Sequence, residues 1–125
     1  MYELLVVENE ESLRKLYQEE LEEEGYGVVC VSSAKEALDK IREGHFHLVV
    51  LDIKMPGMDG LELLGKMLGE ERKIPVIINS AYPRYKSDFM SWAAEAFIVK
   101  SSNLGELKDT IKKVLTKYYP DENKV

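Results

Sequence analysis

Polar residues able to do ionic chemistry follow short apolar runs in this sequence: Glu8, Asp52, the pair Asn79-Ser80, and Lys100. A carboxylate at the end of a buried strand is unfavourable unless a cation, a metal ion or a hydrogen-bond donor compensates it. Two such carboxylates can hold a hard divalent cation through their oxygen atoms. A lysine and a hydroxyl can hold an anion. A cation and an anion beside a central carboxylate describe a site for phosphoryl transfer to that carboxylate.

The segment that carries the central acid runs from Leu48 to Gly60 and reads LVVLDIKMPGMDG. Its four consecutive apolar residues show no alternation, which predicts a strand covered on both faces. Asp52 follows that strand directly, and the Pro-Gly pair after it is typical of a type II turn. Asp59, with Glu62 three residues later, has the pattern of a capping box at the start of a helix. The segment therefore predicts a strand, an acid, a turn and a helix in succession.

Similar apolar runs recur along the chain and alternate with segments of helical periodicity. The runs predict five strands, at residues 4–7, 28–31, 48–51, 76–78 and 97–99. Five helices are predicted to follow the strands, at residues 10–24, 34–43, 60–68, 85–93 and from the cap at Asn103 to Tyr118. Strands that alternate with helices in this way indicate an α/β domain with a parallel sheet and helices on both faces.

Local signals predict where several of these helices begin and end. Gly25 is a natural stop for the first helix. Capping boxes are predicted at the start of the second and last helices, at Ser33/Glu36 and Asn103/Glu106. The inward faces follow from spacings of three and four residues. They comprise Leu13, Leu16, Tyr17 and Leu21 in the first helix, Ala34, Ala37, Leu38 and Ile41 in the second, Leu61, Leu64 and Leu68 in the third, and Leu107, Ile111, Val114, Leu115 and Tyr118 in the last.

The carboxyl ends of the strands in an open parallel sheet all lie at one edge, where ligands bind at the point of reversal in strand order. If the first, third and fourth strands are neighbours, Glu8, Asp52 and Ser80 meet Lys100 at this edge. The sequence therefore predicts one pocket that contains two acids, a hydroxyl and a lysine.

Composition narrows the class of protein. The chain has 125 residues, which fits one domain with one core, and its net charge of −6 argues against direct DNA binding. The single cysteine cannot form an internal disulfide, which agrees with a reducing cytoplasm. No apolar run is long enough to span a bilayer, and the N-terminus has no basic region, so we expect no membrane segment and no signal peptide.

Four motifs in register give the chain a family resemblance. They are VVENEES at the acidic pocket, LDIKMPGMDG at the central acid, PVIINSAY at the hydroxyl and AFIVKSS at the lysine. Together they resemble the response-regulator receiver domains of two-component systems, similar to single-domain, chemotaxis-type (CheY-like) regulators, over about the full length of the chain. The resemblance implies a doubly wound, flavodoxin-like sheet of order 2-1-3-4-5 with five flanking helices. It also implies a receiver domain over residues 1–119 and a flexible tail at 120–125.

The resemblance also implies a role for each site residue. Asp52 would accept a phosphoryl group from the phosphohistidine of a histidine kinase. Mg²⁺ would be held by Glu8, Asp52 and the backbone carbonyl of Lys54. Lys100 would pair with the phosphoryl group, and Ser80 would hydrogen-bond to it. The chain would then be a phosphoacceptor rather than an enzyme, beyond any part in its own phosphorylation and dephosphorylation.

A two-state switch is implied in the same way. Ser80 would move toward the phosphoryl group, and Phe97, three residues before the lysine, would turn into the vacated space. The surface of the fourth helix, fifth strand and last helix would then change its preference for protein partners through a population shift. The implied partners are a sensor histidine kinase or histidine phosphotransfer protein and a downstream effector protein. The chain itself would be a monomer or a phosphorylation-dependent dimer.

Two positions depart from the family pattern. The usual pair of successive carboxylates is Glu8-Asn9 here. Asn9 can still offer its carbonyl oxygen to Mg²⁺, or it can cap the first helix, where Asn is favourable. Ser101 stands where the family has a proline joined by a cis peptide bond. A cis bond before serine costs about 2.5–4 kcal/mol, so we expect either a trans bond with a rearranged loop or a cis bond held by the fold.

Other classes of protein share parts of this pattern. A flavodoxin has a phosphate loop rich in Ser, Thr and Gly after the first strand, whereas this loop is acidic and would repel phosphate. A haloacid-dehalogenase-type phosphatase has a second Asp two residues after the first, where this chain has Lys54. A third alternative is a receiver-like interaction module that does not depend on phosphorylation. Asn9 favours that module, whereas the intact Asp52, Ser80 and Lys100 favour the phosphoacceptor.

Overall fold

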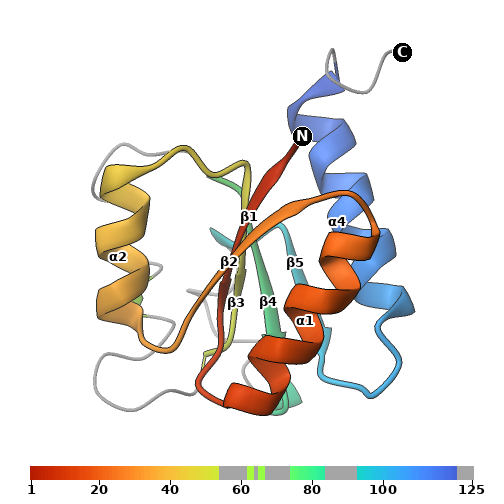
Figure 1. Cartoon of the computed structure of the whole chain (residues 1–125), viewed down its shortest axis with the longest axis horizontal. Helices are drawn as coiled ribbons and strands as arrows, with labels where there is room; N and C mark the ends of the chain where they lie inside the picture. Colours follow the sequence, from red (N-terminus) through yellow and green to blue (C-terminus); the bar gives the residue numbers. More distant parts are fainter. Residues whose placement is uncertain (54–61, 64, 67–73, 84–92, 121–125) are drawn as a thin grey trace.

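The computed structural model describes residues 1–53, 62–63, 65–66, 74–83 and 93–120. Its strands are β1 (Glu3–Val7), β2 (Gly27–Val31), β3 (Leu48–Leu51), β4 (Val76–Ser80) and β5 (Ala96–Val99). They form one sheet in the order β2-β1-β3-β4-β5, in which every neighbouring pair is parallel (Figure 1). The predicted fold class and strand order are therefore confirmed.

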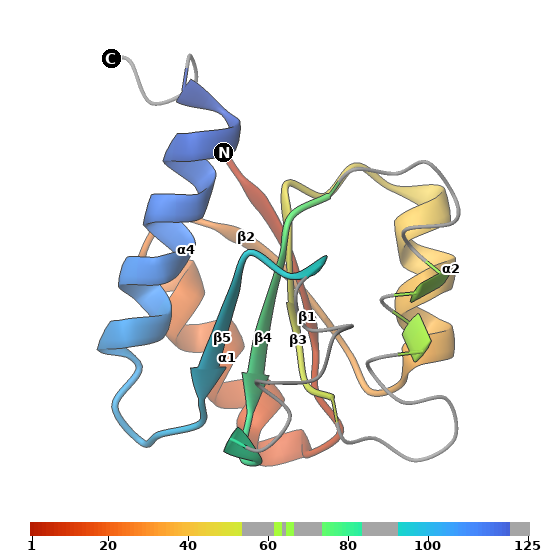
Figure 2. The same ribbon diagram turned by 180° about the vertical axis from the view of Figure 1, so that it is seen from behind.

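Helices cover both faces of this sheet. Helices α1 (Glu11–Glu23) and α4 (Gly105–Tyr118) lie on one face, and α2 (Ala34–Glu43) lies on the other (Figures 1 and 2). Residues 62–63 and 65–66 are also helical, within the third helix predicted at 60–68. The helix predicted at 85–93 falls, except for its last residue, outside the described residues, as does the tail after Pro120. In the part of the chain that is described, no helix is both long and apolar enough to cross a bilayer.

Alternate strand residues build two separate apolar cores, because successive side chains of a strand point to opposite faces. The core beneath α2 includes Leu5, Val7, Ala37, Ile41 and Ile78. The core beneath α1 and α4 includes Leu4, Val6, Tyr17, Ile77 and Ile111. With apolar layers on both sides, residues 4–7 of β1 and all of β3 are buried, which explains the unbroken apolar runs.

The ends of α1 and α2 follow their sequence signals closely. α1 ends before Gly25, which adopts the left-handed conformation with φ of 94°. At the start of α2, the Ser33 hydroxyl accepts a hydrogen bond from the Glu36 amide at 3.2 Å. The Glu36 carboxylate reaches one residue further back than a capping box requires and accepts from the amide and hydroxyl of Ser32. The hydrogen bond to the Ser33 hydroxyl is therefore as predicted, whereas the bond to the Glu36 carboxylate comes from Ser32 and not from Ser33.

The capping box predicted at Asn103 and Glu106 is wrong. Helix α4 begins at Gly105, with Leu104 at the N-cap and no side-chain cap bond. The Asn103 side-chain oxygen accepts from the amide of Gly105, two residues later, at 2.8 Å. This bond forms an Asx turn immediately before the helix. Such local Asx turns compete with capping for the same side chain.

Most inward residues of the helices were predicted correctly, with a few exceptions. Leu16 and Tyr118 are exposed, by 38% and 39%, although both were predicted to face inward. The inward stripe of α1 is narrower than its apolar spacing suggests, and Tyr118 instead bonds through its hydroxyl to Glu95. Leu63 is fully buried although it was not predicted. The three leucines predicted for the third helix lie outside the described residues: Leu61, Leu64 and Leu68.

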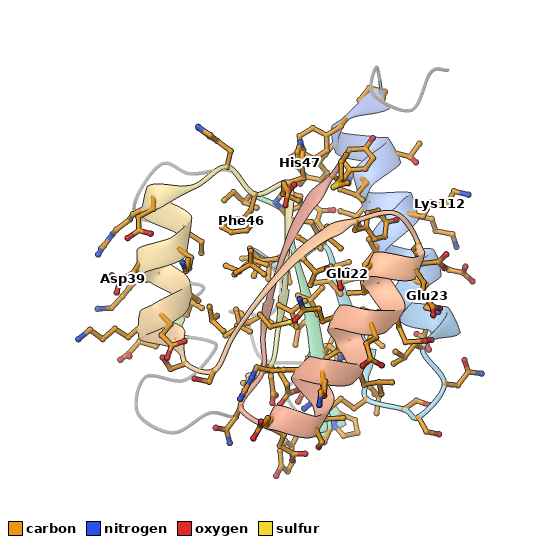
Figure 3. The ribbon with its side chains drawn as sticks, viewed as in Figure 1. Glu22, Glu23, Asp39, Phe46, His47 and Lys112 are labelled. Carbon is orange, nitrogen blue, oxygen red and sulfur yellow. The ribbon has the colours of Figure 1, made fainter. Side chains whose placement is uncertain are left out.

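An aromatic cluster of Tyr2, His47 and Tyr119 lies at the amino ends of the strands (His47 is labelled in Figure 3). The rings of His47 and Tyr119 are 5.0 Å apart and nearly perpendicular. The Tyr119 hydroxyl donates to the backbone carbonyl of His47 at 2.9 Å, and His47 Nδ1 accepts from the amide of Glu3 at 2.9 Å. The cluster therefore joins the end of α4 to the starts of β1 and β3.

Candidate functional site

The backbone register carries four polar residues to the carboxyl edge of the sheet. Ser80 ends β4, and Glu8, Asp52 and Lys100 each follow a strand by one residue. Sheet-like hydrogen bonds extend past the strand ends, from the Asp52 amide to Val7 at 3.0 Å and from the Lys100 amide to Ser80 at 2.8 Å. The hydrogen bonding of the parallel sheet thus continues for one residue beyond the strands and fixes the backbone positions of Asp52 and Lys100.

Glu8, Asp52 and Lys100 form an ion triad. The Lys100 ammonium lies 2.6 Å from Glu8 Oε1 and 3.0 Å from Asp52 Oδ2. Glu8 is 2% exposed and Asp52 is 7% exposed. Burial alone would lower the pKa of Lys100, but the hydrogen bonds to both carboxylates and their negative charges together outweigh burial and raise that pKa. The lysine is therefore charged and supplies the compensation that two buried carboxylates need.

The acidic loop (residues 8–10) is held by contacts that the sequence did not reveal. The second carboxylate oxygen of Glu8 accepts from the amide of Glu10 at 3.1 Å. The Arg14 guanidinium, one turn into α1, donates to the backbone carbonyls of Glu8 at 2.9 Å and Asn9 at 2.7 Å. A lysine or arginine near a helix start is too common for its sequence position alone to predict this contact.

Asn9 does not cap α1. The N-cap residue is Glu10, which makes no side-chain cap bond. The Asn9 side chain is exposed and lines the pocket over the ion triad. Of the two alternatives left open by the sequence, the helix cap is therefore excluded, and the carbonyl ligand stays a prediction.

A pocket of about 230 Å³ opens over the triad. Its lining residues come from two walls and a base: Glu8, Asn9 and Glu10 on one side, Ala81 and Tyr82 on the other, and Asp52 and Lys100 below. Ser80 is fully buried, and its hydroxyl accepts from the amide of Tyr82 at 3.0 Å. The hydroxyl is thus engaged with its own turn in this structure.

Of the remaining predicted site residues, only Phe97 can be placed. It is half-buried, lies beside Ile78 in the sheet and packs against the core beneath α2. Lys54, the predicted carbonyl ligand, lies outside the described residues. The bond between Lys100 and Ser101 is trans, since the described residues contain no cis peptide bond. Trans geometry was one of the two outcomes expected for a serine at this position.

The family of the chain follows from comparison with known sequences. The family model of the response regulator receiver domain matches residues 4–112. The chain belongs to the response regulator receiver domain family. Its membership accounts for the strand order, for the acidic loop and for the polar residues at the carboxyl edge of the sheet.

Curated relatives of this receiver domain include proteins named as regulators. The chain is 34% identical to the uncharacterized transcriptional regulatory protein YkoG of Bacillus subtilis and 33% identical to the two-component response regulator PhoP of Pseudomonas aeruginosa. Each match covers 90% of this chain but only about half of the relative, 50% and 51%. Sporulation initiation phosphotransferase F of B. subtilis is 32% identical, and the match covers 90% of this chain and 92% of that protein.

Solved structures confirm the CheY-like fold of the receiver domain. The response regulator TrrA of Thermotoga maritima, solved in complex with Mg(2+)-BeF, is 44% identical with a TM-score of 0.88. That match covers 91% of this chain and 99% of TrrA. TrrA has also been solved in complex with the histidine kinase ThkA, with a TM-score of 0.86 to this chain. A CheY-like receiver domain from Methanospirillum hungatei is 30% identical, with a TM-score of 0.90 over 97% of this chain and 98% of that one.

The donor set of the receiver site is compatible with Mg²⁺. Mg²⁺ usually binds through one or two carboxylates and completes its shell with water and phosphate oxygens. Glu8 and Asp52 provide two converging carboxylates, and they already hold a cation, the Lys100 ammonium. The described residues contain no group of three or more His, Cys, Asp or Glu side chains that could hold a metal by themselves. A shared site, completed by water and a phosphoryl group, fits these residues better than a closed protein cage.

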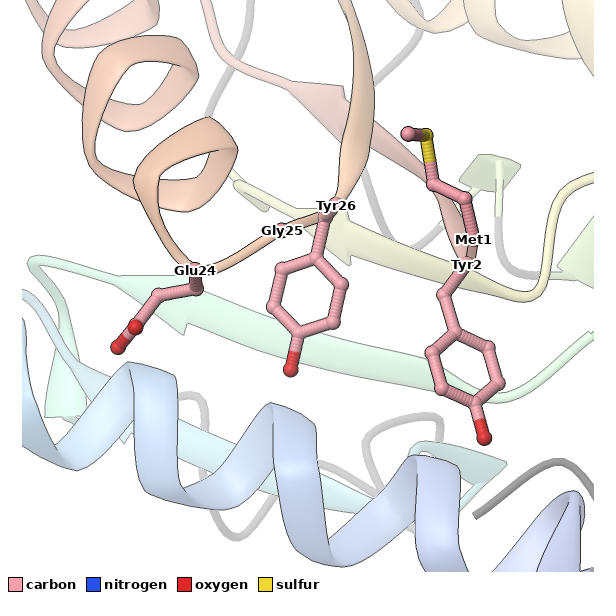
Figure 4. Close-up of a pocket in the computed structure, with 5 residues that line it drawn as sticks. All are labelled: Met1, Tyr2, Glu24, Gly25 and Tyr26. Atoms are coloured by element: carbon pink, nitrogen blue, oxygen red, sulfur yellow. The ribbon is translucent and has the colours of Figure 1, made fainter. Parts of the chain in front are cut away.

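A larger pocket lies far from this receiver site. It measures about 480 Å³ and is lined by Met1, Tyr2, Glu24, Gly25 and Tyr26 near the amino edge of the sheet (Figure 4). Tyr2 and Tyr26 stand side by side there, with ring centroids 6.4 Å apart. Glu24 is the one charged side chain among its described lining residues, so this pocket shows no counterpart there to the ion triad. The convergence of charged groups identifies the candidate site better than pocket size does.

Proposed function

We propose that this receiver domain is a phosphoacceptor in two-component or phosphorelay signalling, with Asp52 as the acceptor. The supporting observation is the ion triad, in which Lys100 holds two buried carboxylates at the base of an open pocket. An attacking carboxylate needs neighbouring positive charge to approach a phosphoryl group, and the triad has that charge in place. The phosphoryl donor is the phosphohistidine of a sensor histidine kinase or of a histidine phosphotransfer protein.

The transfer is a displacement at phosphorus. A carboxylate oxygen of Asp52 forms a bond to the phosphorus as the P–N bond to the donor histidine breaks. The imidazole leaves with the bonding electron pair and takes up a proton. Hydrolysis later returns the Asp52 carboxylate and releases inorganic phosphate, as a water oxygen replaces the aspartyl oxygen on phosphorus.

Each of the other site residues has a role in this step. Lys100 neutralises charge on the transferred group, and Ser80 turns from the Tyr82 amide to donate a hydrogen bond to it. Glu8, Asp52 and the backbone carbonyl of Lys54 would hold Mg²⁺, and Asn9 would offer its side-chain carbonyl oxygen as a fourth ligand. When bound, Mg²⁺ supplies positive charge that offsets the charge of the phosphoryl oxygens.

The output is a change of surface. Once Ser80 has moved, Phe97 turns into the space that it leaves. The surface made by residues 85–93, β5 and α4 then binds a downstream effector protein differently, as a shift between two populated states. Phosphoryl relay to a second histidine is the other route by which the signal can leave.

The comparisons support these partner classes. TrrA has been solved with a histidine kinase, and one relative is named as a phosphotransferase. We propose a cytoplasmic receiver domain over residues 1–119, acting as a monomer or a phosphorylation-dependent dimer. The net charge of −6 favours protein partners over DNA.

One specific observation favours a second function. Asn9 replaces the second acid of the family pair, and its side chain faces the pocket. A receiver-like interaction module that works without phosphorylation would tolerate this change. The intact ion triad supports the phosphoacceptor more strongly, because the module would have no need of it.

Labelling with a small phosphodonor tests the proposal. Incubation with acetyl phosphate and Mg²⁺ should add one phosphoryl group to the intact mass, and removal of Mg²⁺ by a chelator should prevent the addition. Asp52→Ala should abolish it, whereas Asp39→Ala, which removes an exposed aspartate of α2 (Figure 3), should not. Equal labelling of Asp52→Ala and the wild-type chain would exclude Asp52 as the acceptor.

A further inference from the structure

A buried hydrogen bond joins two polar side chains next to the phosphoacceptor site. The side-chain amide of Asn79 donates to the phenol oxygen of Tyr17 at 3.0 Å. Tyr17, on α1, is 3% exposed and Asn79, on β4, is 4% exposed. Tyr17 belongs to the apolar core beneath α1 and α4. None of the roles proposed above for the site uses this pair.

The pair links the two elements next to the pocket walls, because α1 follows the acidic loop and β4 leads into Ala81 and Tyr82. Asn79 directly precedes Ser80, and strand alternation turns these two side chains to opposite faces of the sheet. Tyr17 lies about one turn along α1 from Arg14, whose guanidinium holds two backbone carbonyls of the acidic loop. α1 is therefore tied to the acidic loop through Arg14 and to the end of β4 through Tyr17.

The Tyr17 phenol also lies within electrostatic range of the ion triad. Its pKa is raised, chiefly by burial and further by Glu8 and Asp52, while the Asn79 hydrogen bond and the Lys100 charge act in the opposite direction. A cavity of about 370 Å³ is lined by both Tyr17 and Lys100. Tyr17 and Lys100 therefore line the same cavity, on the side of the sheet that α1 covers.

Stability alone does not require a polar pair at this place. Both groups give up hydrogen bonds to water when they are buried, so the net gain is small, and an apolar pair of the same shape can be as stable. A hydrogen bond differs from an apolar contact in its direction, because it fixes both the distance and the angle between its partners. The pair therefore fixes how α1 sits relative to the end of β4.

We propose that Tyr17 and Asn79 are a positioning pair for phosphoryl transfer, which holds the acidic loop and the end of β4, with Ser80, at the separation that a phosphoryl group requires. This inference rests on the function proposed above for Asp52. The pair acts through the acidic loop on one side and through Ser80 on the other. Without it the walls still form, but they must be ordered at the moment of transfer, and the reaction is slower.

Single and double variants separate positioning from stability. Tyr17→Phe and Asn79→Leu each remove the hydrogen bond and leave one buried polar partner unsatisfied, so both should lower the thermal midpoint. The double variant leaves no unsatisfied partner and should recover most of the lost stability. Both the thermal midpoint and the rate of phosphorylation by acetyl phosphate in Mg²⁺ are measured for all three variants.

The expected result is that all three variants are phosphorylated about two- to tenfold more slowly than the wild type, the range of one net hydrogen bond. The double variant should stay slow although its thermal midpoint has recovered. A double variant whose rate recovers together with its stability would overturn the positioning role. Tyr26→Phe is the matched control, because it removes a hydroxyl from a half-buried tyrosine at the opposite edge and should leave the rate unchanged.

Two further outcomes are decisive. If the double variant remains unstable, Tyr17→Phe and Tyr26→Phe are compared well below both thermal midpoints, and equal rates would overturn the proposal. Failure of the underlying function looks different, because the wild-type chain itself is then not labelled, or Asp52→Ala is labelled as well as the wild type.

Discussion

The two edges of the sheet are stabilised by different kinds of contact. At the carboxyl edge, Lys100 holds Glu8 and Asp52 by ionic hydrogen bonds of 2.6 and 3.0 Å. At the amino edge, the aromatic cluster packs ring against ring, with centroids 5.0 to 6.1 Å apart. Ionic partners can be exchanged for another cation or anion without loss of the fold, whereas packed rings have no equivalent partner to exchange. The carboxyl edge is therefore the one suited to chemistry, because its ionic contacts can be replaced by contacts with a bound cation or anion.

Removal of the Lys100 ammonium is expected to have the largest effect on the difference between the two edges. Lys100→Met leaves two buried carboxylates without their cation and should lower the free energy of unfolding at pH 7 by about 3 kcal/mol. Mg²⁺ should restore part of that loss in proportion to its occupancy, because it binds the folded state. Urea denaturation with and without Mg²⁺ measures both effects. Lys112→Met, an exposed lysine of α4 (Figure 3), is the control and should change little. Equal stability of the two variants would contradict the ion triad.

Restoring the second acid of the family pair at residue 9 tests the carboxyl edge by adding a charge instead of removing one. Asn9→Asp adds a negative charge to the pocket lining and should tighten Mg²⁺ binding about tenfold, a gain of about 1.4 kcal/mol. The same charge should lower stability in the absence of metal, because it repels Glu8 and Asp52. Calorimetry or the fluorescence of the single tryptophan gives the affinity. Asn103→Asp adds the same charge outside the pocket and serves as the control. An unchanged affinity would show that residue 9 contributes nothing to cation binding.

The smallest effect is expected beside the amino edge, where Tyr118 and Lys117 both bond to Glu95. The hydrogen bond to Glu95 raises the pKa of Tyr118 to about 12, and the same bond is the main cause that lowers the pKa of Glu95. The raised tyrosine pKa contributes stability below pH about 10 that is lost as pH approaches 12. The lowered carboxyl pKa contributes stability above pH about 4.5 that is lost as pH falls further.

Tyr118→Phe should therefore reduce the free energy of unfolding by less than about 1 kcal/mol, since the pair is partly exposed. The loss should be greatest between these two pH limits and should vanish beyond them. Urea denaturation over a pH series measures it, with Tyr26→Phe as the control. A loss that is the same at every pH would mean that the ring, and not the hydrogen bond, accounts for the effect. Phosphorylation should be unaffected, in contrast to the variants at the carboxyl edge.

The sequence by itself determined the sheet and the identity of the polar residues at its carboxyl edge. Apolar runs without alternation are sufficient to indicate strands buried on both faces, and such strands align in parallel with their ends at one edge. Glu8, Asp52, Ser80 and Lys100 were therefore predicted to meet if the first, third and fourth strands are neighbours, and the strand order itself was implied by the family resemblance. Gly25 and the Ser33 cap were also predicted, because helix ends depend on contacts within a few residues.

Only the tertiary structure decided which of these groups are partners. The pairing of Lys100 with Glu8 as well as Asp52, and the Tyr17–Asn79 hydrogen bond, join segments that are distant in the sequence. The contact of Arg14 with the acidic loop is local, but no sequence pattern indicates it. Sequence periodicity gives the direction in which a side chain points, but not what it meets. A partner across the sheet depends on the height and rotation of whole elements, and these are set by the packing of both cores together.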